Sequence, residues 1–412
     1  MKCSLTEASL AEVCNLVTDG THDTPKRVPS GFPLIKAKEI VTGQIDFSSC
    51  DQISESEHRK VIARSKPEFG DTLFTHIGAS LGAAAYVNTT REFSIKNIAL
   101  FKPNPVIIDA RYLYYVVLSP EFQSLAIGTK TGSAQPFLGL SQLRGHRIHY
   151  HRNLPTQRRI AGILSAYDEL IENSQRRIKI LESMARGLYR EWFVHFRFPG
   201  HESVPRVPSP LGEIPKGWEG AFGDISTIDR VGINPFDFPN EEFEHYSIPA
   251  FDDGCSAAIE TGETIRSNKY CIDKDCVLLS KLNPRIPRVW LPSPTESRRS
   301  ITSTEFLVLR PKSGVSREFI YGKCCSDDFA AQFAGLAIGT STSHQRVRPE
   351  NVLAMPSTVP THAVIEQFTT RTAPMLAASD QLRLKIQNLR RTRDLLLPRL
   401  LSGQIDVEAM AS

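Results

Sequence analysis

The stretch Asn234-Pro235-Phe236-Asp237 comes nearest to a catalytic motif in this sequence. Adenine methyltransferases hold the base that they flip out of the duplex in an Asn/Asp-Pro-Pro-aromatic loop. Here the second proline is missing, and no G-x-G turn for the methyl donor occurs anywhere in the chain. These residues therefore do not indicate a methyltransferase site.

The signatures of other DNA-processing enzymes are missing as well. A common class of restriction nuclease needs a lysine two positions after an acidic residue, and no Asp or Glu here has one. The phosphate-binding G-x-x-x-x-G-K-[ST] loop, H-E-x-x-H and G-x-S-x-G do not occur, and the eight cysteines form no C-x-x-C pair for zinc. The sequence predicts a binding protein that is not an enzyme and holds no metal. An enzyme with a site assembled from scattered residues is the alternative.

The composition is that of a globular protein of two or three domains, with 412 residues of which 41% are hydrophobic and 23% charged. The net charge is only +4, but segments 155–198 and 361–405 hold an excess of Lys and Arg. Such an excess indicates either a solvated helix face or contact with nucleic acid. Because no apolar leader or membrane-length apolar run occurs, and the cysteines are scattered, we expect a cytoplasmic protein with free thiols.

The chain repeats itself with a period of about half its length. Residues 125–131 read LAIGTKT and residues 336–342 read LAIGTST, six identities in seven at an offset of 211. Weaker matches follow the same order at nearly the same offset: Phe122 with Phe333, Asp71 with Asp275, Pro103 with Pro311, and Leu154-Pro155-Thr156 with Val359-Pro360-Thr361. The shared order indicates an internal duplication.

Each half has short β-like runs between turn residues and then a long helical pattern that begins after the Pro-Thr pair. We predict an α+β fold in which two similar domains are separated by two long antiparallel helices that form a coiled coil, with an internal pseudo-two-fold repeat. The predicted parts are a first domain over 1–153, a central helix over 154–198, a proline-rich linker over 199–215, a second domain over 216–357 and a C-terminal helix over 358–405.

The first helix carries apolar residues in alternating steps of four and three, which is the spacing of a coiled-coil seam, and the second follows the same spacing less cleanly. The seams are expected to pack against each other, and pairing with a second copy of the chain is the alternative. Pro374 and Pro398 should kink or end the second helix locally. The predicted seam residues are Ile160, Leu164, Tyr167, Ile171, Ile178, Leu181, Leu188, Trp192, Met375, Leu382, Ile386, Leu389 and Leu396.

Several short motifs occur in one order along this layout. They are Asp19-Gly20-Thr21-His22-Asp23-Thr24-Pro25, Ile214-Pro215-Lys216-Gly217-Trp218 with Gly223-Asp224-Ile225, Ser341-Thr342-Ser343-His344-Gln345-Arg346, and the helix ends around Trp192 and Leu397–Gly403. With the duplication, they make the chain resemble the specificity subunits of type I restriction–modification systems. The likeness spans essentially the whole chain.

The resemblance implies a non-catalytic recognition subunit of a type I deoxyribonuclease and adenine methyltransferase complex. Each domain would be a target-recognition domain that reads one half of a split double-stranded DNA site. The coiled coil would dock two modification (methyltransferase) subunits, and translocase–nuclease subunits would join for cleavage. No cofactor is expected on this chain, because S-adenosylmethionine, ATP and Mg²⁺ would belong to the partners. The alternative is a free-standing coiled-coil DNA-binding protein or repressor.

Loop residues with forked or amide donors are the candidates for DNA contact, because Arg and Lys read guanine and Asn and Gln read adenine in the major groove. Lys, Ser and Thr more often hold phosphate. The alternative for each residue is a surface charge or a histidine bonded within its own loop. The candidates are Thr21, His22, Lys26, Lys36, Lys38, His76, Lys130, Ser133 and Gln135 in the first half, and Lys281, Asn283, Arg285, Arg288, Ser343, His344, Gln345 and Arg346 in the second. The repeat offset pairs Gly132-Ser133-Ala134-Gln135 with Ser343-His344-Gln345-Arg346.

Overall fold

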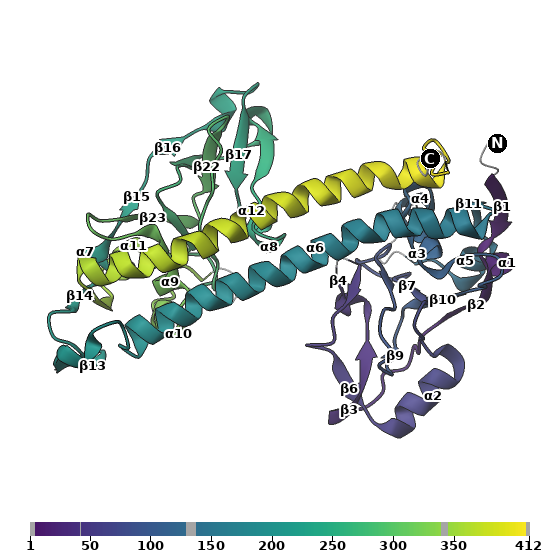
Figure 1. Cartoon of the computed structure of the whole chain (residues 1–412), viewed down its shortest axis with the longest axis horizontal. Coiled ribbons are helices and arrows are strands. Elements are labelled where there is room, and N and C mark those ends of the chain that lie inside the picture. Colours follow the sequence, from purple (N-terminus) through teal and green to yellow (C-terminus); the bar gives the residue numbers. More distant parts are fainter. Residues whose placement is uncertain (1–4, 42, 129–136, 339–344, 409–412) are drawn as a thin grey trace. The chain divides into compact units, whose positions relative to one another are not determined.

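The computed structural model describes residues 5–41, 43–128, 137–338 and 345–408. The chain divides into two compact units, residues 1–172 together with 387–412, and residues 173–386. Each unit contains one half of the sequence repeat and one end of each of two long helices, which Figure 1 shows in teal and yellow. The first unit is consequently built from segments at both ends of the sequence.

The first unit is organised around a four-stranded antiparallel sheet of order β2-β10-β7-β8. Strand β1 pairs with β11 beside the short helix α1, and a separate three-stranded sheet, β6-β3-β9, packs against α2. The strands are β1 (Leu5–Ser9), β2 (Cys14–Asp19), β3 (Arg27–Ile35), β4 (Ile40–Val41), β5 (Gln44–Ile45), β6 (Asp51–Ile53), β7 (Thr72–Phe74), β8 (Ala84–Tyr86), β9 (Ser94–Ile95), β10 (Ala99–Pro103) and β11 (Arg147–His151). The helices are α1 (Leu10–Val13), α2 (Glu55–Ser65), α3 (Ala110–Leu118), α4 (Pro120–Gly128) and α5 (Leu140–Gly145).

The second unit has the same central sheet, in the order β15-β23-β20-β21, and β14 pairs with β24. Its outer sheet is larger, with five strands in the order β16-β19-β22-β17-β18. The strands are β12 (Arg206–Ser209), β13 (Gly212–Pro215), β14 (Glu219–Ala221), β15 (Ser226–Asp229), β16 (Gly232–Ile233), β17 (Glu242–Tyr246), β18 (Ala258–Thr261), β19 (Lys269–Ile272), β20 (Val277–Ser280), β21 (Val289–Trp290), β22 (Arg299–Ser303), β23 (Phe306–Pro311) and β24 (Pro356–Thr358). The helices are α7 (Phe222–Ile225), α8 (Ile248–Asp252), α9 (Arg317–Cys324), α10 (Asp327–Gly335) and α11 (Pro349–Leu353).

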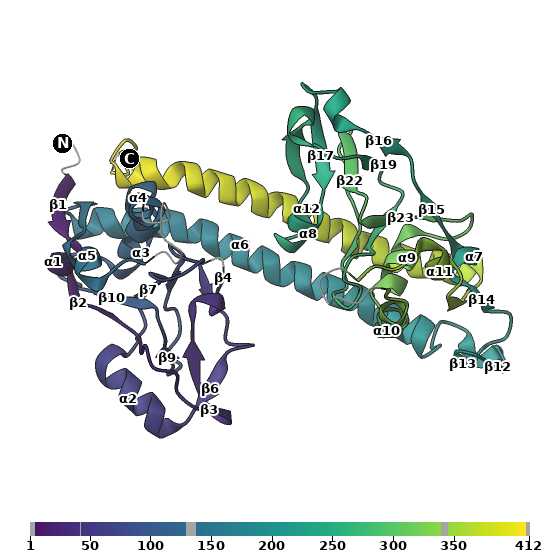
Figure 2. The same cartoon turned by 180° about the vertical axis from the view of Figure 1, so that it is seen from behind.

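The two units share one order of elements around the central sheet. Strands β2, β7, β8 and β10 correspond to β15, β20, β21 and β23, and α3, α4 and α5 correspond to α9, α10 and α11. The same end of each domain packs on the long helices, as Figures 1 and 2 show for each unit. The predicted fold class, α+β with a repeated domain and two long antiparallel helices, is confirmed.

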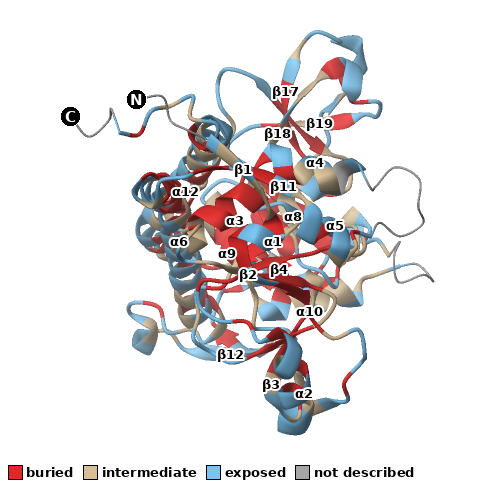
Figure 3. Cartoon of the chain, turned by 90° about the vertical axis from the view of Figure 1, so that its right-hand side faces the viewer, coloured by how far each residue is buried: buried red, intermediate tan, exposed pale blue. Residues whose placement is uncertain are grey.

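The long helices are α6 (Leu154–Tyr189, 36 residues) and α12 (His362–Leu401, 40 residues). In the first unit the start of α6 packs against the end of α12, since Leu164, Leu397 and Leu400 lie in one apolar core. In the second unit the end of α6 packs against the start of α12 through Tyr189 and Phe368. All thirteen predicted seam residues are buried or half-buried, while the outward face of each helix is mostly exposed (Figure 3).

The predicted ends of both helices need correction. The α-helix α6 ends at Tyr189, and a π-helical turn, Arg190–Val194, replaces the expected continuation to residue 198. Trp192 and Phe193 in this turn are buried in the apolar core of the second unit, which favours the wider turn over a regular one. Helix α12 runs from His362 to Leu401, so neither Pro374 nor Pro398 ends it. Buried Leu376 and Leu400 each follow one of these prolines by two residues and anchor the helix there.

The proline-rich stretch predicted as a linker over 199–215 is ordered. It contains a short 3₁₀ turn (His201–Ser203) and the hairpin of β12 and β13. Ile214 is buried, and the Trp218 ring after the hairpin stacks on Phe198 with 4.8 Å between centroids. The few apolar residues of this segment therefore extend the core of the second unit, although proline content alone favours a linker.

Candidate nucleic-acid interface

A surface loop follows strand β7 in the first unit and is joined there by a distant chain segment. The Leu138 amide donates to the His76 carbonyl at 2.9 Å, and Ile77 forms an antiparallel bridge with Phe137. The loop then turns at Gly78, whose φ is +86°. This left-handed conformation is readily adopted by glycine. The side chain of Phe137 is left half-exposed at 54%.

The second unit repeats this arrangement after strand β20. The Val347 amide donates to the Lys281 carbonyl at 3.1 Å, Leu282 bridges Arg346, and the turn occurs at Asn283 with a φ of +51°. Asparagine tolerates this region better than most residues. We call residues 76–82 with 137–138, and residues 281–288 with 345–347, the paired-loop sites of the two units.

Equivalent positions in the two paired-loop sites follow from this geometry. Phe137 corresponds to Arg346, since each precedes its following helix, α5 or α11, by three residues and bridges the same loop position. The repeat offset had instead paired Gln135 with Arg346. The correction is two residues, because the offset between equivalent positions is not constant: the helix N-caps Ser119 and Ser326 differ by 207, whereas Phe137 and Arg346 differ by 209.

Two predicted cations of the second unit already have carboxylate partners. Arg346, with 51% of its side chain exposed, pairs with Glu305 through Nε (3.0 Å to Oε2) and Nη2 (2.9 Å to Oε1), and this contact raises the pKa of Arg346. Arg288 is bonded to both oxygens of Asp252, at 2.7 and 2.9 Å, and its side chain is only 12% exposed. Arg346 therefore presents its guanidinium to solvent, whereas Arg288 is held mainly within the protein.

The remaining described candidates of the second unit lie in the same paired-loop site. The Asn283 amide donates to the Gln345 carbonyl at 2.9 Å, and Asn283 Oδ1 is buried. Lys281 is half-buried and Arg285 is exposed at the tip of the loop. The structure thus brings together in one unit the residues that the sequence placed in two separate segments.

The first unit has a second loop, Gly20–Pro25, that is tightly fixed to the turn after β9. A Cβ on Gly20 would lie 2.1 Å from the Ile95 carbonyl oxygen, so only glycine permits this approach. Lys96 Nζ donates to the Asp23 carbonyl at 2.7 Å, to Thr24 Oγ1 at 2.6 Å and to the His22 carbonyl at 3.3 Å. Half-buried Lys96 therefore ties this loop to the turn after β9.

Two candidates of this loop, Thr21 and His22, make internal hydrogen bonds. Thr21 bonds through its backbone to Ile95 and Asn97, and its Oγ1 accepts from the Asp23 amide at 3.1 Å. His22 Nε2 lies 2.8 Å from Asp19 Oδ2, and Nδ1 lies 2.9 Å from Asn97 Oδ1. Both ring nitrogens of His22 are therefore occupied, although the ring is half-exposed.

The three candidate lysines of the first unit that the structure describes differ in their surroundings. Lys36 is paired with Asp51, and the hydrogen bond from Lys36 is the main cause that lowers the pKa of Asp51. Lys38 Nζ lies 3.2 Å from buried Glu39, with most of its side chain exposed. Lys26 is exposed directly after the fixed loop. Lys26 and Lys38 are thus the more accessible of the three.

His76 does not fit the prediction of direct DNA contact. Its side chain is only 1% exposed, its Nδ1 bonds to the Leu138 carbonyl at 2.9 Å, and burial lowers the pKa of its imidazole. A histidine in a loop is usually exposed, which is why the sequence predicted DNA contact. Here the ring is buried and contacts Phe137 and the Leu138 carbonyl of the paired-loop site. Five other candidates, Lys130, Ser133, Gln135, Ser343 and His344, lie outside the described residues.

Sequence reasoning missed three residues of these surfaces. Lys96 acts on backbone oxygens more than 70 positions away, and Glu305 supports an arginine 41 positions later. Phe137 has an apolar side chain, which the search for polar donors passed over. The only usable signal was the positive-φ preference at Gly78 and Asn283, which marks equivalent turns.

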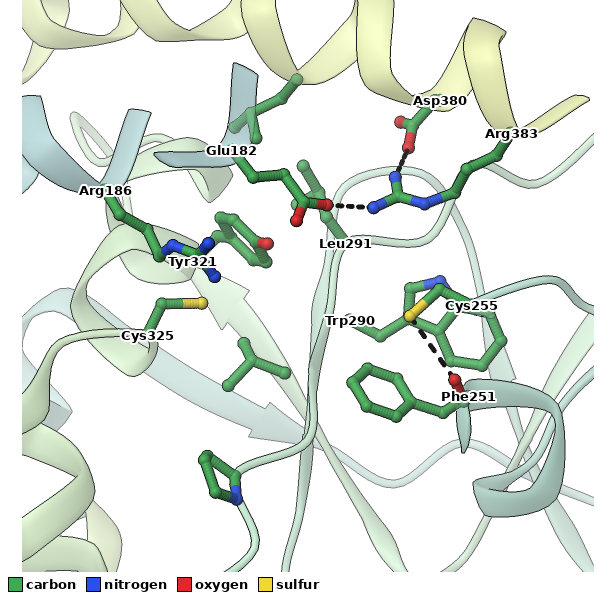
Figure 4. A pocket seen from close by; sticks show the side chains of 13 residues that line it. Glu182, Arg186, Phe251, Cys255, Trp290, Leu291, Tyr321, Cys325, Asp380 and Arg383 are labelled. Atoms are coloured by element: carbon green, nitrogen blue, oxygen red, sulfur yellow. Dashed lines mark hydrogen bonds and ion pairs between the residues drawn. The ribbon is translucent and has the colours of Figure 1, made fainter. Parts of the chain in front are cut away.

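The stretch nearest to a catalytic motif and the best-defined pocket of the second unit are both closed by internal hydrogen bonds. Asn234–Asp237 forms a short 3₁₀ turn closed by an Asn234–Asp237 hydrogen bond of 2.8 Å. A pocket of about 190 Å³ in the second unit is crossed by Arg383, which bonds to Glu182 and Asp380, as Figure 4 shows. In the described part of the chain, no group of three or more His, Cys, Asp or Glu could hold a metal, and no helix is long and apolar enough to cross a membrane.

Comparison with known proteins identifies relatives in sequence and fold. The chain is 26% identical over 215 residues to the specificity subunit of the type I restriction enzyme MjaX of Methanocaldococcus jannaschii, a match of 51% of this chain and 49% of that protein. It is 25% identical over 311 residues to the MjaIX specificity subunit of the same organism, covering 73% and 70%. The match therefore covers about half the length of the MjaX protein.

The fold is also that of a solved specificity subunit. The S subunit of a type I restriction–modification system from M. genitalium superimposes with a TM-score of 0.59 over 97% of this chain and 96% of that one, at 15% identity. These relatives and this fold confirm the resemblance that the sequence motifs indicate. No family model matches the sequence.

Proposed function

We infer that the chain belongs to the specificity subunits of type I restriction–modification enzymes, and we propose that it recognises the DNA target of such a complex. The observation that carries this proposal is the duplicated paired-loop site. One backbone frame occurs twice, and it presents different side chains, Phe137 in one unit and Arg346 in the other. A protein that reads a split, asymmetric target needs this combination of similar supports and different reading surfaces.

Each unit would read one half of the target from its loops. Exposed cations such as Lys26, Lys38 and Arg285 are suited to phosphate or guanine, and Gln345 is suited to adenine. The residues held inside the protein, Lys36, His76 and Arg288, would support the loops and not contact bases. Recognition would therefore rest on few residues in each unit.

The partners would be two modification subunits and, for cleavage, translocase–nuclease subunits. S-adenosylmethionine, ATP and Mg²⁺ would be bound by these partners. Each unit would offer its own docking surface where apolar side chains are exposed on the long helices. These residues are Leu170 and Leu395 in the first unit, and Ile180, Met184 and Leu384 in the second.

The docking surfaces can be tested by co-purification. Met184→Glu with Leu395→Glu should reduce the modification subunit recovered with the tagged chain at least tenfold. Asn173→Glu, a new carboxylate at an exposed polar position of α6, serves as the matched control and should leave the recovery unchanged. Equal recovery with all three chains would exclude these surfaces.

The decisive test of the proposed function is methylome sequencing of cells that express the chain with the modification subunit of its system. A split motif that carries one methylated adenine in each half, and that disappears without this chain, is the expected result. Exchange of residues 1–150 for those of another specificity subunit should change one half of the motif only. If methylation does not depend on this chain, the proposal is wrong.

A further inference from the structure

The paired-loop sites place two large side chains at one equivalent position. Phe137 and Arg346 bridge the same loop residue of their units, and they are exposed to nearly the same extent, 54% for Phe137 and 51% for the Arg346 side chain. Their supports differ. The Phe137 ring rests against buried His76 with 5.9 Å between centroids, whereas the Arg346 guanidinium is fixed by Glu305.

Among the described residues, the Arg346 side chain bonds to Glu305 through one donor edge only. Glu305 takes the edge formed by Nε and Nη2, and the edge formed by Nη1 and Nη2 is the one with which an arginine bonds to O6 and N7 of guanine. A carboxylate that fixes the first edge holds the second in a set direction, which lowers the entropy lost on binding. Exposed Arg285 and Ile286 lie in the loop that Arg346 bridges.

Phe137 at the same position has no hydrogen-bonding group. The base edge that an apolar side chain recognises in the major groove is the C5 methyl group of thymine. The bridge between Phe137 and Ile77, the hydrogen bond from the Leu138 amide to the His76 carbonyl, and the buried His76 ring beside Phe137 set the position of the Phe137 ring. Phe137 and Arg346 are therefore both held in place by neighbouring residues of their units. The first presents an apolar ring and the second a charged donor.

We propose that position 137/346 is a specificity-determining position, at which Arg346 reads a guanine in one half of the target and Phe137 reads a thymine methyl group in the other. This inference rests on the proposed function, because it names the bases that the same recognition sites would contact.

The test uses the full chain in complex with its modification subunit and duplexes that carry the methylated motif. In one set of duplexes each guanine is replaced in turn by 7-deazaguanine, which lacks the N7 acceptor. In a second set each thymine is replaced by uracil, which lacks the methyl group. One guanine substitution should weaken binding of the wild-type complex roughly tenfold to a hundredfold. One thymine substitution in the other half should weaken it several-fold.

The variants assign each effect to a residue. Arg346→Lys keeps a cation beside Glu305 but loses the forked donor, so 7-deazaguanine should no longer weaken its binding. Phe137→Ala should become insensitive to uracil at the thymine in the other half. Arg298→Gln, which removes an exposed arginine paired with Glu242, and Phe69→Ala, which removes an exposed ring, are the matched controls and should behave as wild type.

The outcomes separate the inference from the function on which it rests. If the wild-type chain directs no split methylation motif, the proposed function fails. If the motif exists but both variants keep the wild-type sensitivity to the modified bases, only the inference fails. If no single 7-deazaguanine weakens binding of the wild-type complex, and Arg346→Lys keeps the wild-type affinity and salt dependence, Arg346 contacts phosphate and the inference is overturned.

Discussion

The central sheets of the two units are alike, whereas their outer sheets are not. Both central sheets have four strands in the same order, and both support a paired-loop site at the end of the third strand. The outer sheet has three strands in the first unit and five in the second. The central sheet is thus kept after duplication, and the outer sheet, whose strands lie in the sequence between the first and last strands of the central sheet, has diverged.

This difference between central and outer sheets reflects how strongly burial restricts substitutions in each. Strands β7 and β20 of the central sheets are fully buried, so most changes to smaller residues there would leave a cavity. The loops and the outer sheets carry exposed residues that can change at little energetic expense. Divergence between the units is therefore expected at the reading surfaces.

The largest expected effect concerns the ordered segment 199–215 and the Trp218 that follows it. The first unit has no equivalent of this segment among its described residues. Trp218→Ala removes a ring that is 2% exposed and stacked on Phe198, so the free energy of opening of the second unit should fall by about 3–5 kcal/mol. Native-state hydrogen exchange, resolved by unit, measures this change. The first unit and the control Phe69→Ala should show little change. An equal loss in both units would contradict the division into separate units.

A second comparison concerns the ion pairs between the helices. In the first unit Asp168 accepts from Tyr115 and from Arg393, both at 2.6 Å, whereas in the second unit Glu182 pairs with Arg383, which also holds Asp380. Asp168→Ala should lower the opening free energy of its unit by about 1–3 kcal/mol, because the half-buried Tyr115 hydroxyl loses its acceptor, although Arg393 keeps its bonds to Asp394. Glu182→Ala should lower that of the second unit by less, since Arg383 keeps Asp380.

The control for this pair is Glu169→Ala, which removes an exposed carboxylate 3.2 Å from Arg111. Its effect should be below about 0.5 kcal/mol, as for most surface ion pairs. If Glu169→Ala destabilised the first unit as much as Asp168→Ala, the contacts of Asp168 would not be the cause. Hydrogen exchange of the same amides in all three variants decides between these results.

The fixed loop Gly20–Pro25 occurs in the first unit and depends on Lys96. Lys96→Met removes three hydrogen bonds from the loop, so binding to the half-site of the first unit should weaken roughly tenfold, which is about 1.4 kcal/mol. Binding to the other half-site should not change. Lys60→Met, which removes an exposed lysine of α2 paired with Glu57, is the control. Competition with duplexes altered in one half-site at a time measures both effects, and equal weakening by the two variants would argue against a role for the loop.

The smallest expected effect is a difference in acid sensitivity. Among the described residues, burial lowers the pKa of His58, His76 and His146 in the first unit and of His245 in the second. Such histidines are neutral in the native state, so the unfolded chain takes up more protons below its own pKa near 6.5. The stability they contribute is present above that pH and is lost as the pH falls through it.

Lowering the pH from about 7.5 to about 5.5 should therefore reduce the opening free energy of the first unit more than that of the second. Hydrogen exchange at the two pH values, corrected for the intrinsic exchange rate, measures the difference. His76→Gln should make the acid-induced losses of opening free energy in the two units more similar. Glutamine can still bond to the Leu138 carbonyl but does not titrate. A larger loss in the second unit would show that other groups dominate.

Much of the fold could be predicted from the sequence, because the long helices and the duplication produce periodic patterns along the chain. The heptad spacing from Ile160 to Trp192 and the shared LAIGT strings depend only on local order along the chain. The π-helical turn at Arg190–Val194 and the order of segment 199–215 depend on tertiary packing around Trp218, which no local pattern expresses.

The candidate site could be predicted only in part, for a similar reason. Arg346 and Asn283 carried the right chemistry and lie together in the structure. The burial of His76 and the equivalence of Phe137 with Arg346 follow from contacts between segments about 60 residues apart. A residue type indicates what a side chain can do, but only the fold decides whether it faces solvent.

The composition of the first unit has a consequence for synthesis of the protein. Its apolar core contains Leu10 and Tyr112 together with Leu397, Leu400 and Val407, and His151 bonds to the Leu400 carbonyl at 3.1 Å. While the ribosome is still translating the last codons of this region, the domain that emerged first lacks one wall of its core. The second unit, residues 173–386, has by then received all of its own segments. A frameshift or premature stop shortly before codon 397 would therefore damage the half of the protein encoded first and spare the half encoded nearest to the lesion.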